Sequence, residues 1–106
     1  MLAPVKVATD LSNGNSAVFN AQWYPFVVAQ LTLSYGTSCT IIVKMQASLD
    51  NSHWVDIVSD TFSNGDGATV SLVKPAGEWW LYYRLNITVD KVATFVTDAW
   101  MGAGGS

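Results

Sequence analysis

The sequence predicts an all-β protein, a single antiparallel β-sandwich or jelly roll of about seven or eight strands. Three observations favour this class. Val, Ile, Thr and aromatic residues dominate the chain, whereas charged helix-forming residues are scarce and Glu occurs once, at position 78. No segment keeps the apolar spacing of an α-helix over three turns, and the spacing that recurs is two residues. Short apolar runs alternate with clusters of Gly, Asn, Asp and Pro, which is typical of strands joined by tight turns.

Eight segments are expected to form the strands, in the order 5–9, 17–22, 27–35, 40–48, 53–58, 68–73, 79–89 and 93–101. Three of them show the clearest alternation and are expected to form the centre of the fold, namely 27–35, 40–48 and 79–89. The residues expected to face the core are Val27, Ala29, Leu31, Leu33 and Tyr35 in the first, and Trp79, Leu81, Tyr83, Leu85, Ile87 and Val89 in the last. In the middle one, Ile41, Val43, Met45 and Ala47 alternate with Ile42, Lys44, Gln46 and Ser48.

Clusters with turn chemistry separate these segments, at 12–16, 35–37, 50–52, 63–67 and 74–77. Gly and Asn supply positive φ, and Pro presets the first turn residue, so each cluster is interpreted as a chain reversal and not as a flexible linker. Pro25 marks a bend or an edge, because proline donates no hydrogen bond to a β-ladder.

The 106 residues are enough for one hydrophobic core and too few for two, so a single domain is expected over residues 1–101. Residues 102–106, Gly-Ala-Gly-Gly-Ser, carry no side chain that would anchor them. They are expected to form a flexible Gly-rich C-terminal tail, either loose or held by another subunit.

Charged residues make up 12% of the chain, against about 25% in an average soluble domain, while 50% are apolar or aromatic. The surface is therefore expected to be neutral and partly covered by a partner. Five scattered basic residues and a net charge of −3 argue against nucleic acid as that partner. No apolar run reaches the roughly 18 residues of a membrane span, so no membrane partner is expected. The N-terminus lacks the pattern of a signal peptide, so synthesis in the cytoplasm is expected.

Groups suited to catalysis are few. The single His53 and the single Cys39 provide neither a nucleophile with its base nor a zinc site, and Cys39 is expected to be a small buried residue. The acidic residues lie mostly in or beside turns, where Asp is common for conformational reasons. Asp60, Asn64 and Asp66 offer oxygen ligands for calcium, but the closing Glu of the strong calcium motif is absent. The sequence therefore predicts no enzyme activity, no cofactor and no metal.

One polar strand face carries large aromatic residues. Trp80 and Tyr82 alternate with the expected core set and form a row with Arg84, and Trp100 lies near the Gly-rich end. Three explanations remain open: a face covered by the same chain, a subunit interface anchored by Trp, Tyr and Arg, or a platform on which aromatic rings stack against sugars. These four residues are the candidate interface.

Two segments form a recognisable pattern of residue types, namely residues 43–56, VKMQASLDNSHWVD, and residues 82–88, YYRLNIT. The first is similar to the strand, Ser-x-Asp turn and Trp-containing strand of the small β-sandwich virion proteins of tailed bacteriophages, and the second resembles the strand near their C-terminus. The resemblance implies a capsid decoration (cement) protein on the virion surface, made in the host cytoplasm. It implies a homotrimer, with the major capsid protein and copies of itself as partners. Related patterns occur in carbohydrate-binding sandwiches and in tail or fibre domains, so a module that reads a cell-surface glycan is the alternative.

The same residues also have a purely structural explanation. Trp54 is expected to fill the core beside the strand 79–89, and Asp50 and Asn51 are expected to form the hairpin turn. Arg84 is placed to pair with a carboxylate such as Asp56 across strands.

Overall fold

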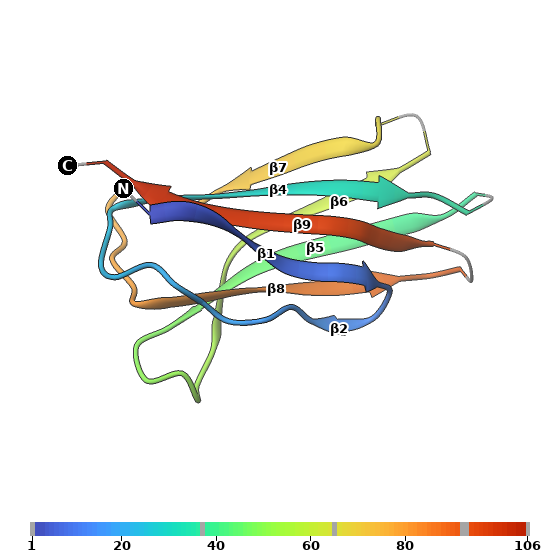
Figure 1. Cartoon of the computed structure of the whole chain (residues 1–106). Coiled ribbons are helices and arrows are strands. Elements are labelled where there is room, and N and C mark those ends of the chain that lie inside the picture. The colour runs from blue at the N-terminus through green and yellow to red at the C-terminus, as the bar shows by residue number, and fades with distance from the viewer. Residues whose placement is uncertain (1, 37, 65, 92–93, 106) are drawn as a thin grey trace.

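The computed structural model describes residues 2–36, 38–64, 66–91 and 94–105, and these residues form nine β-strands and no helix. The strands are β1 (Leu2–Leu11), β2 (Gly14–Asn15), β3 (Phe19–Asn20), β4 (Phe26–Ser34), β5 (Thr40–Ser48), β6 (Val55–Ser63), β7 (Thr69–Val73), β8 (Tyr82–Val89) and β9 (Phe95–Gly104). Two antiparallel sheets face each other as a β-sandwich (Figure 1). Sheet A has the order β1-β9-β4-β7, and sheet B has the order β2-β8-β5-β6, with β3 also paired to β8. The predicted all-β sandwich is confirmed.

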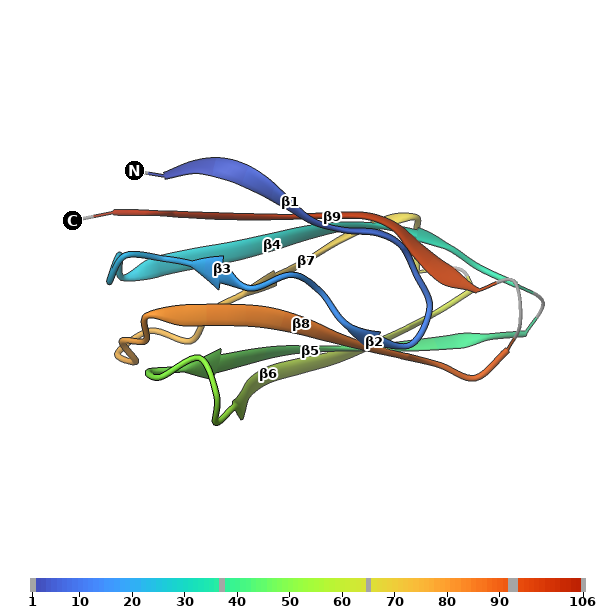
Figure 2. The same ribbon diagram turned by 60° about the horizontal axis from the view of Figure 1, so that its bottom comes forward.

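The chain passes repeatedly from one sheet to the other. It runs from β1 in sheet A to β2 and β3 in sheet B, returns to β4, and crosses again to β5 and β6, which form a hairpin. It then crosses to β7, to β8 and finally to β9. Both termini lie at one end of the sandwich, together with the β3–β4 and β7–β8 connections (Figures 1 and 2). We call this end the terminal end.

Side chains from both sheets meet in one core, and the two-residue alternation accounts for most of it. The buried residues of the three central segments are Val27, Ala29, Leu31 and Leu33 on β4, Ile41, Val43, Met45 and Ala47 on β5, and Tyr83, Leu85 and Ile87 on β8. The last strand, β9, adds Val96, Ala99, Met101 and Ala103. Removing one leucine-sized side chain from water contributes roughly 1.5–3 kcal/mol, so this core is the main source of stability.

The strand expected at 79–89 begins later, at Tyr82, and Trp79 is 64% exposed instead of buried, so its assignment to the core was wrong. The residues before Tyr82 form a connection that Lys74 fixes, because its buried Nζ donates to two carbonyl oxygens within the same connection. The alternation therefore does not extend back through this loop. Trp80, expected on the polar face, instead packs against the core.

The shorter strands differ from their expected bounds by a few residues. Both β1 and β6 are longer than the segments 5–9 and 53–58, and β3 retains only Phe19–Asn20 of the segment 17–22. The strand expected at 68–73 is found, one residue shorter. The start that was expected at Ala93 lies outside the described residues, and β9 begins at Phe95.

The C-terminal glycines belong to the sheet. Gly102 and Gly104 continue β9 and lie opposite Val28 and Phe26 of β4, and Ala103 between them is buried. The expectation of a flexible tail from residue 102 onward was therefore wrong for residues 102–104. It was based on the lack of anchoring side chains, but a β-ladder is held by backbone hydrogen bonds, which glycine makes as well as any residue.

Candidate functional site

The outer face of sheet B is polar and carries a continuous chain of side-chain contacts. Arg84 Nε donates to Gln46 Oε1 at 2.8 Å, and Gln46 Nε2 donates to Asp56 Oδ1 at 2.8 Å. Lys44 Nζ lies 3.5 Å from the other carboxylate oxygen of Asp56. The hydrogen bond from Gln46 and the positive charge of Lys44 hold the pKa of Asp56 below its usual range.

The direct ion pair expected between Arg84 and Asp56 was wrong. Gln46 lies opposite Asp56 on one side and opposite Arg84 on the other, because β5 runs between β6 and β8. The amide therefore separates the two charges and contacts both. The order of strands in the sheet decides this, and it is not visible in the spacing of the residues.

Trp54 lies beside this polar chain and is only partly buried, so its expected place in the core was wrong. The guanidinium carbon of Arg84 lies 4.3 Å from the centroid of the Trp54 ring, which is the geometry of a cation–π contact. One face of the ring is therefore covered by Arg84.

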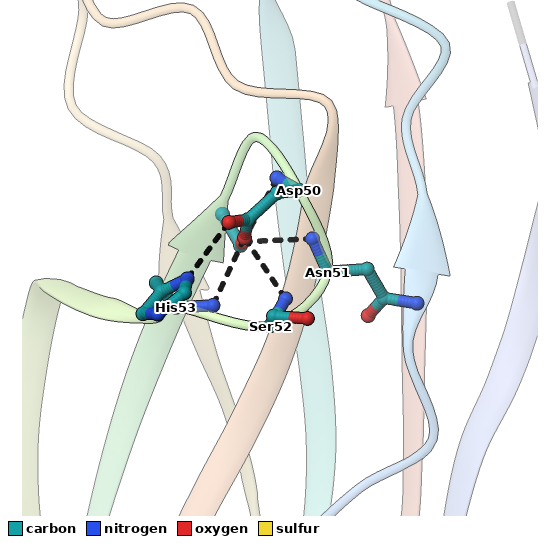
Figure 3. A network of polar contacts seen from close by, with 5 residues as sticks. Asp50, Asn51, Ser52 and His53 are labelled. Atoms are coloured by element: carbon teal, nitrogen blue, oxygen red, sulfur yellow. Dashed lines mark hydrogen bonds and ion pairs between the residues drawn. The ribbon is translucent and has the colours of Figure 1, made fainter.

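A tight turn before Trp54 holds the loop between β5 and β6 (Figure 3). Asp50 Oδ1 accepts the backbone N–H groups of Ser52 and His53, both at 2.9 Å, and Oδ2 lies 2.8 Å from the His53 ring. Ser48 Oγ donates to Asp50 and accepts the N–H of Asn51, whose φ is 61°. The predicted Asp50–Asn51 turn is confirmed.

The hydrogen bonds from His53 and Ser52 hold the pKa of Asp50 far below its usual range. The carboxylate is the hub of the cluster, because both the Ser48 hydroxyl and the His53 ring contact Asp50 and not each other. A serine nucleophile needs its base within hydrogen-bond reach, and here that contact is absent from the cluster. The hydrogen bonds of the cluster therefore stabilise the turn, and they leave the His53 side chain 90% exposed.

Of the candidate calcium ligands, Asp60 lies within β6, whereas Asn64 and Asp66 lie in the turn after it. This turn and the segment at Cys39 use their polar atoms for internal hydrogen bonds. Cys39 is buried, as predicted, and its N–H donates to Asn64 Oδ1 at 3.1 Å. Asn64 Nδ2 donates to the carbonyl oxygen of Gly36, and Asp66 Oδ2 accepts the N–H of Ser63 at 2.7 Å. Over the described ranges, no three His, Cys, Asp or Glu side chains gather into a metal site.

The four residues of the candidate interface do not form one surface. Tyr82 and Arg84 alternate with the buried residues of β8 and face outward on sheet B. Trp80 is a half-buried loop residue whose Nε1 donates to Glu78 at 3.3 Å. Trp100 lies opposite Gln30 and Lys6 on the outer face of sheet A, on the other side of the sandwich.

The outer face of sheet A carries an apolar groove that the sequence analysis missed. Its floor is the strand β9 at Gly102 and Gly104, and its sides include Pro4, Val28 and Val73. This hollow has a volume of about 350 Å³. A second hollow of about 320 Å³ shares Pro4, Val28 and Gly102 with it and ends at Trp100. The two hollows together form one groove along β9.

Strand register explains the groove. The bulky Phe26 and Val28 of β4 lie opposite Gly104 and Gly102 of β9, so large side chains stand directly beside positions that have none. Phe26 is 60% exposed and Val73 is 61% exposed, and both side chains line this hollow. A sequence signal did exist: residues 26–29 are apolar at four consecutive positions, which places apolar side chains on both faces of the strand.

The terminal end of the sandwich exposes two further tryptophans. Trp79 belongs to the β7–β8 connection, and Trp23, which is 49% exposed, belongs to the β3–β4 connection. Gln22 and Trp23 have φ values of 52° and 65°, in a turn closed by the hydrogen bond from Tyr24 N–H to the Ala21 carbonyl. Two consecutive left-handed residues that are not glycine cost about 1–2 kcal/mol each, so this turn holds Trp23 outward under strain.

Comparison of the sequence with protein families and curated proteins adds no relative. No protein-family model matches this chain, and no curated protein is significantly similar to it in sequence. Within the described ranges there is also no helix with the length and hydrophobicity of a membrane span. The surfaces described above are therefore the basis on which the function is argued.

Proposed function

We propose that this protein is a non-enzymatic structural protein of a phage virion, a capsid decoration (cement) protein that binds the major capsid lattice and copies of itself. The observation that carries the proposal is the amount of apolar surface on a weakly charged chain. Only 12% of its residues are charged, and exposed aromatic side chains occur both at the terminal end and on sheet A. Such surface is expected where a protein is covered by neighbours.

The topology supports the same proposal. With β2 and β3 taken as one interrupted strand, the sheet orders become those of a jelly roll, in which each sheet has four strands and most connections cross between sheets. Viral capsid proteins and lectins both use this architecture. Because a fold does not by itself specify a function, the topology supports the proposal but does not carry it.

The terminal end is the surface proposed to bind the capsid. It combines Trp23 and Trp79 with the start of β1 and the end of β9, which are paired to each other in sheet A. Tryptophan is the residue most enriched among those that dominate binding energy at protein interfaces. The strained turn at Trp23 is maintained at a cost in stability, which is typical of a backbone position kept for function. The mechanism is adhesion, with the burial of apolar area closing gaps between capsid subunits.

The experiment is to search purified particles for this protein by mass spectrometry, and then to add it back to particles that lack it. Wild-type protein is expected to bind the particles and to raise their temperature of disruption. Trp79→Ala is expected to weaken binding about ten-fold or more. Val55→Ala, at a valine exposed on β6, is the matched control and is expected to bind as wild type does. A protein that is absent from particles and does not bind them would overturn the proposal.

A glycan-reading tail or fibre domain is the second candidate, and the free faces of Trp23 and Trp79 favour it, since exposed aromatic rings stack on sugars. The aromatics first considered for this role do not share a surface. Binding on a glycan array that is lost in Trp79→Ala, combined with no binding to capsids, would select this candidate.

A further inference from the structure

Both sheets end in strands whose outer backbone groups are open to pairing with a second protein chain. In the part of the chain that the structure describes, these edge strands are β1 and β7 in sheet A, and β6 and the short pair β2 and β3 in sheet B. Three of the four edges are poorly suited to strand addition. The strand β1 contains Pro4, Lys6 and two register shifts, β7 has five residues, and β2 and β3 have two residues each.

The fourth edge, β6, lacks these protective features. It has nine residues, with neither Pro nor Lys among them. A register shift against β5 leaves Ile57 without a partner, and the pairing is regular from Val58 to Ser63. We call residues 58–63 the regular edge. A straight edge of this length is a template for pairing with another strand unless some other group prevents it.

The backbone N–H of Thr61 lies on the outer side of the regular edge. Thr40 of β5, which lies opposite Ser63, donates its N–H to Asp90 Oδ1 at 2.7 Å, and its carbonyl oxygen accepts the N–H of Asp90. Thr40 therefore directs both backbone groups away from β6, and Thr40 and Ser63 form a pair without mutual hydrogen bonds. Because such pairs recur every second residue, the N–H groups of Thr61 and Ser59 also point away from β5.

Asp60 occupies a core-facing position on this edge, but it is exposed. Val58 and Phe62, two residues away on either side, both belong to the core packing, and Val43 opposite Asp60 is fully buried. The carboxylate turns toward the outer edge, where Oδ1 accepts the N–H of Thr61 at 2.9 Å. A charged side chain at an inward position of an edge strand is one of the devices by which natural sheets avoid edge-to-edge pairing.

A strand added to β6 would compete with Asp60 for the Thr61 N–H and would enclose the carboxylate. The side chains of the added strand would extend the inner face of sheet B beside Asp60, and a carboxylate removed from water without a cation is strongly unfavourable. Lys44 does not offer that cation, because it lies on the outer face and contacts Asp56. At the end of the edge, Ser63 is also occupied, since its N–H donates to Asp66 Oδ2 and its carbonyl oxygen accepts the Asp66 N–H.

We propose that Asp60 prevents the β6 edge from pairing with the β6 edge of a second copy of this chain. A second copy is the partner at issue because two identical edges can pair in antiparallel fashion about a two-fold axis. Replacing Asp60 by an apolar residue then opens this edge and produces an association that the wild type lacks. The inference goes beyond the proposed function and does not depend on it, since it concerns the isolated chain in solution.

The test compares Asp60→Val and Asp56→Val with the wild type by sedimentation equilibrium over a range of concentrations. Both aspartates lie on β6 and each substitution removes one negative charge, but Asp56 contacts Gln46 and Lys44 on the outer face. Asp56→Val is therefore the matched control and is expected to associate as the wild type does. Asp60→Val is expected to form larger species at about ten-fold or more lower concentration. Asp60→Asn, which keeps an oxygen for the Thr61 N–H and removes only the charge, is expected to lie between them.

Amide hydrogen exchange at Ser59 identifies the surface involved. Its outward N–H is expected to exchange rapidly in the wild type and to become protected in associated Asp60→Val. Adding Ser59→Pro to Asp60→Val removes that N–H at an edge position where proline is tolerated, and it is expected to restore the association of the wild type.

Three outcomes would overturn the proposal. The first is that the folded variants at position 60 associate no more than Asp56→Val and Asp56→Asn. The second is that Ser59 is already protected in the wild type, since β6 would then be paired in spite of Asp60. The third is an association of Asp60→Val that Ser59→Pro leaves unchanged, because a different surface would then be responsible. Near-UV circular dichroism of each variant verifies that it is folded.

Discussion

The guanidinium of Arg84 lies over the ring of Trp54, 4.3 Å from its centroid, and joins the loop after β5 to the middle of β8. Arg84 is held in this position by its hydrogen bond to Gln46, and Trp54 follows directly after the Asp50 turn. The contact therefore links the two segments in which the phage resemblance was seen. Its role in the structure is to fix the polar face of sheet B.

Replacing Trp54 and Arg84 by alanine, singly and together, is expected to show a coupling energy of about 1 kcal/mol, since both side chains are partly buried. The measurement is urea unfolding of the four proteins of the double-mutant cycle. The matched cycle uses Lys44 in place of Arg84, because Lys44 is also a cation on this face but contacts Asp56. A coupling for Lys44 as large as that for Arg84 would contradict a specific stacking contact.

Asp50→Asn is expected to reduce the loss of stability in acid. The folded state holds the pKa of Asp50 below its usual value, so the carboxylate stabilises the fold at pH values above the unfolded pKa of about 3.9. That contribution is lost as the pH falls below this value. The measurement is the melting temperature between pH 7 and pH 2 for the wild type and the variant.

Asp56→Asn serves as the comparison for this acid dependence, because the pKa of Asp56 is also lowered, chiefly by Gln46. Asp50 receives more hydrogen bonds than Asp56, so Asp50→Asn is expected to flatten the acid dependence more. The reverse order would show that the Asp50 turn does not persist in solution.

Tyr83→Phe is expected to leave stability at pH 7 unchanged or to raise it by up to about 1 kcal/mol. The Tyr83 hydroxyl is buried near the Trp80 backbone and makes no hydrogen bond of standard geometry, so its removal leaves no partner unsatisfied. Thermal or urea unfolding measures the change. A loss well above 1 kcal/mol would mean that the hydroxyl is bonded in solution.

The same variant is also expected to differ from the wild type in its stability at alkaline pH. Burial raises the pKa of Tyr83 to about 12 from 10.0, so the folded state keeps a proton that the unfolded state loses. The free energy of unfolding is therefore unaffected by this group below pH 10, and it falls as the pH rises from 10 toward 12. Tyr83→Phe is expected to lose less stability over this range than the wild type does.

Gly105→Ala is expected to destabilise the terminal end by about 1 kcal/mol or more, because its φ is +92° and a Cβ there would collide with the Phe26 ring. Gly102→Ala is the control, since a Cβ at that position meets only Pro4 Cγ, at 3.9 Å. Melting temperatures of the two variants measure the difference. Equal values would show that Phe26 does not pack over Gly105 in solution.

Local sequence patterns predicted the strands well where the conformation of each residue depends only on its neighbours in the sequence. The strand β5 was expected and found at Thr40–Ser48, and the inward residues of β4 and β5 followed from alternation and flanking turns. The same reasoning failed at Trp79, because a loop fixed by Lys74 interrupts the alternation. It also failed at Gly102 and Gly104, which pair through their backbone and need no side chain to do so.

The sequence by itself determined that the chain forms a two-sheet β protein with a neutral surface, since composition and two-residue alternation are enough for both. Only the tertiary structure decided which residues lie together on one surface. Tyr82 and Trp100 lie on opposite sides of the sandwich, and the groove on sheet A joins Pro4, Val28, Val73 and Gly102 from four different strands. Alternation states that a strand has two faces, but the order of strands in the sheet decides which residues become neighbours on each of them.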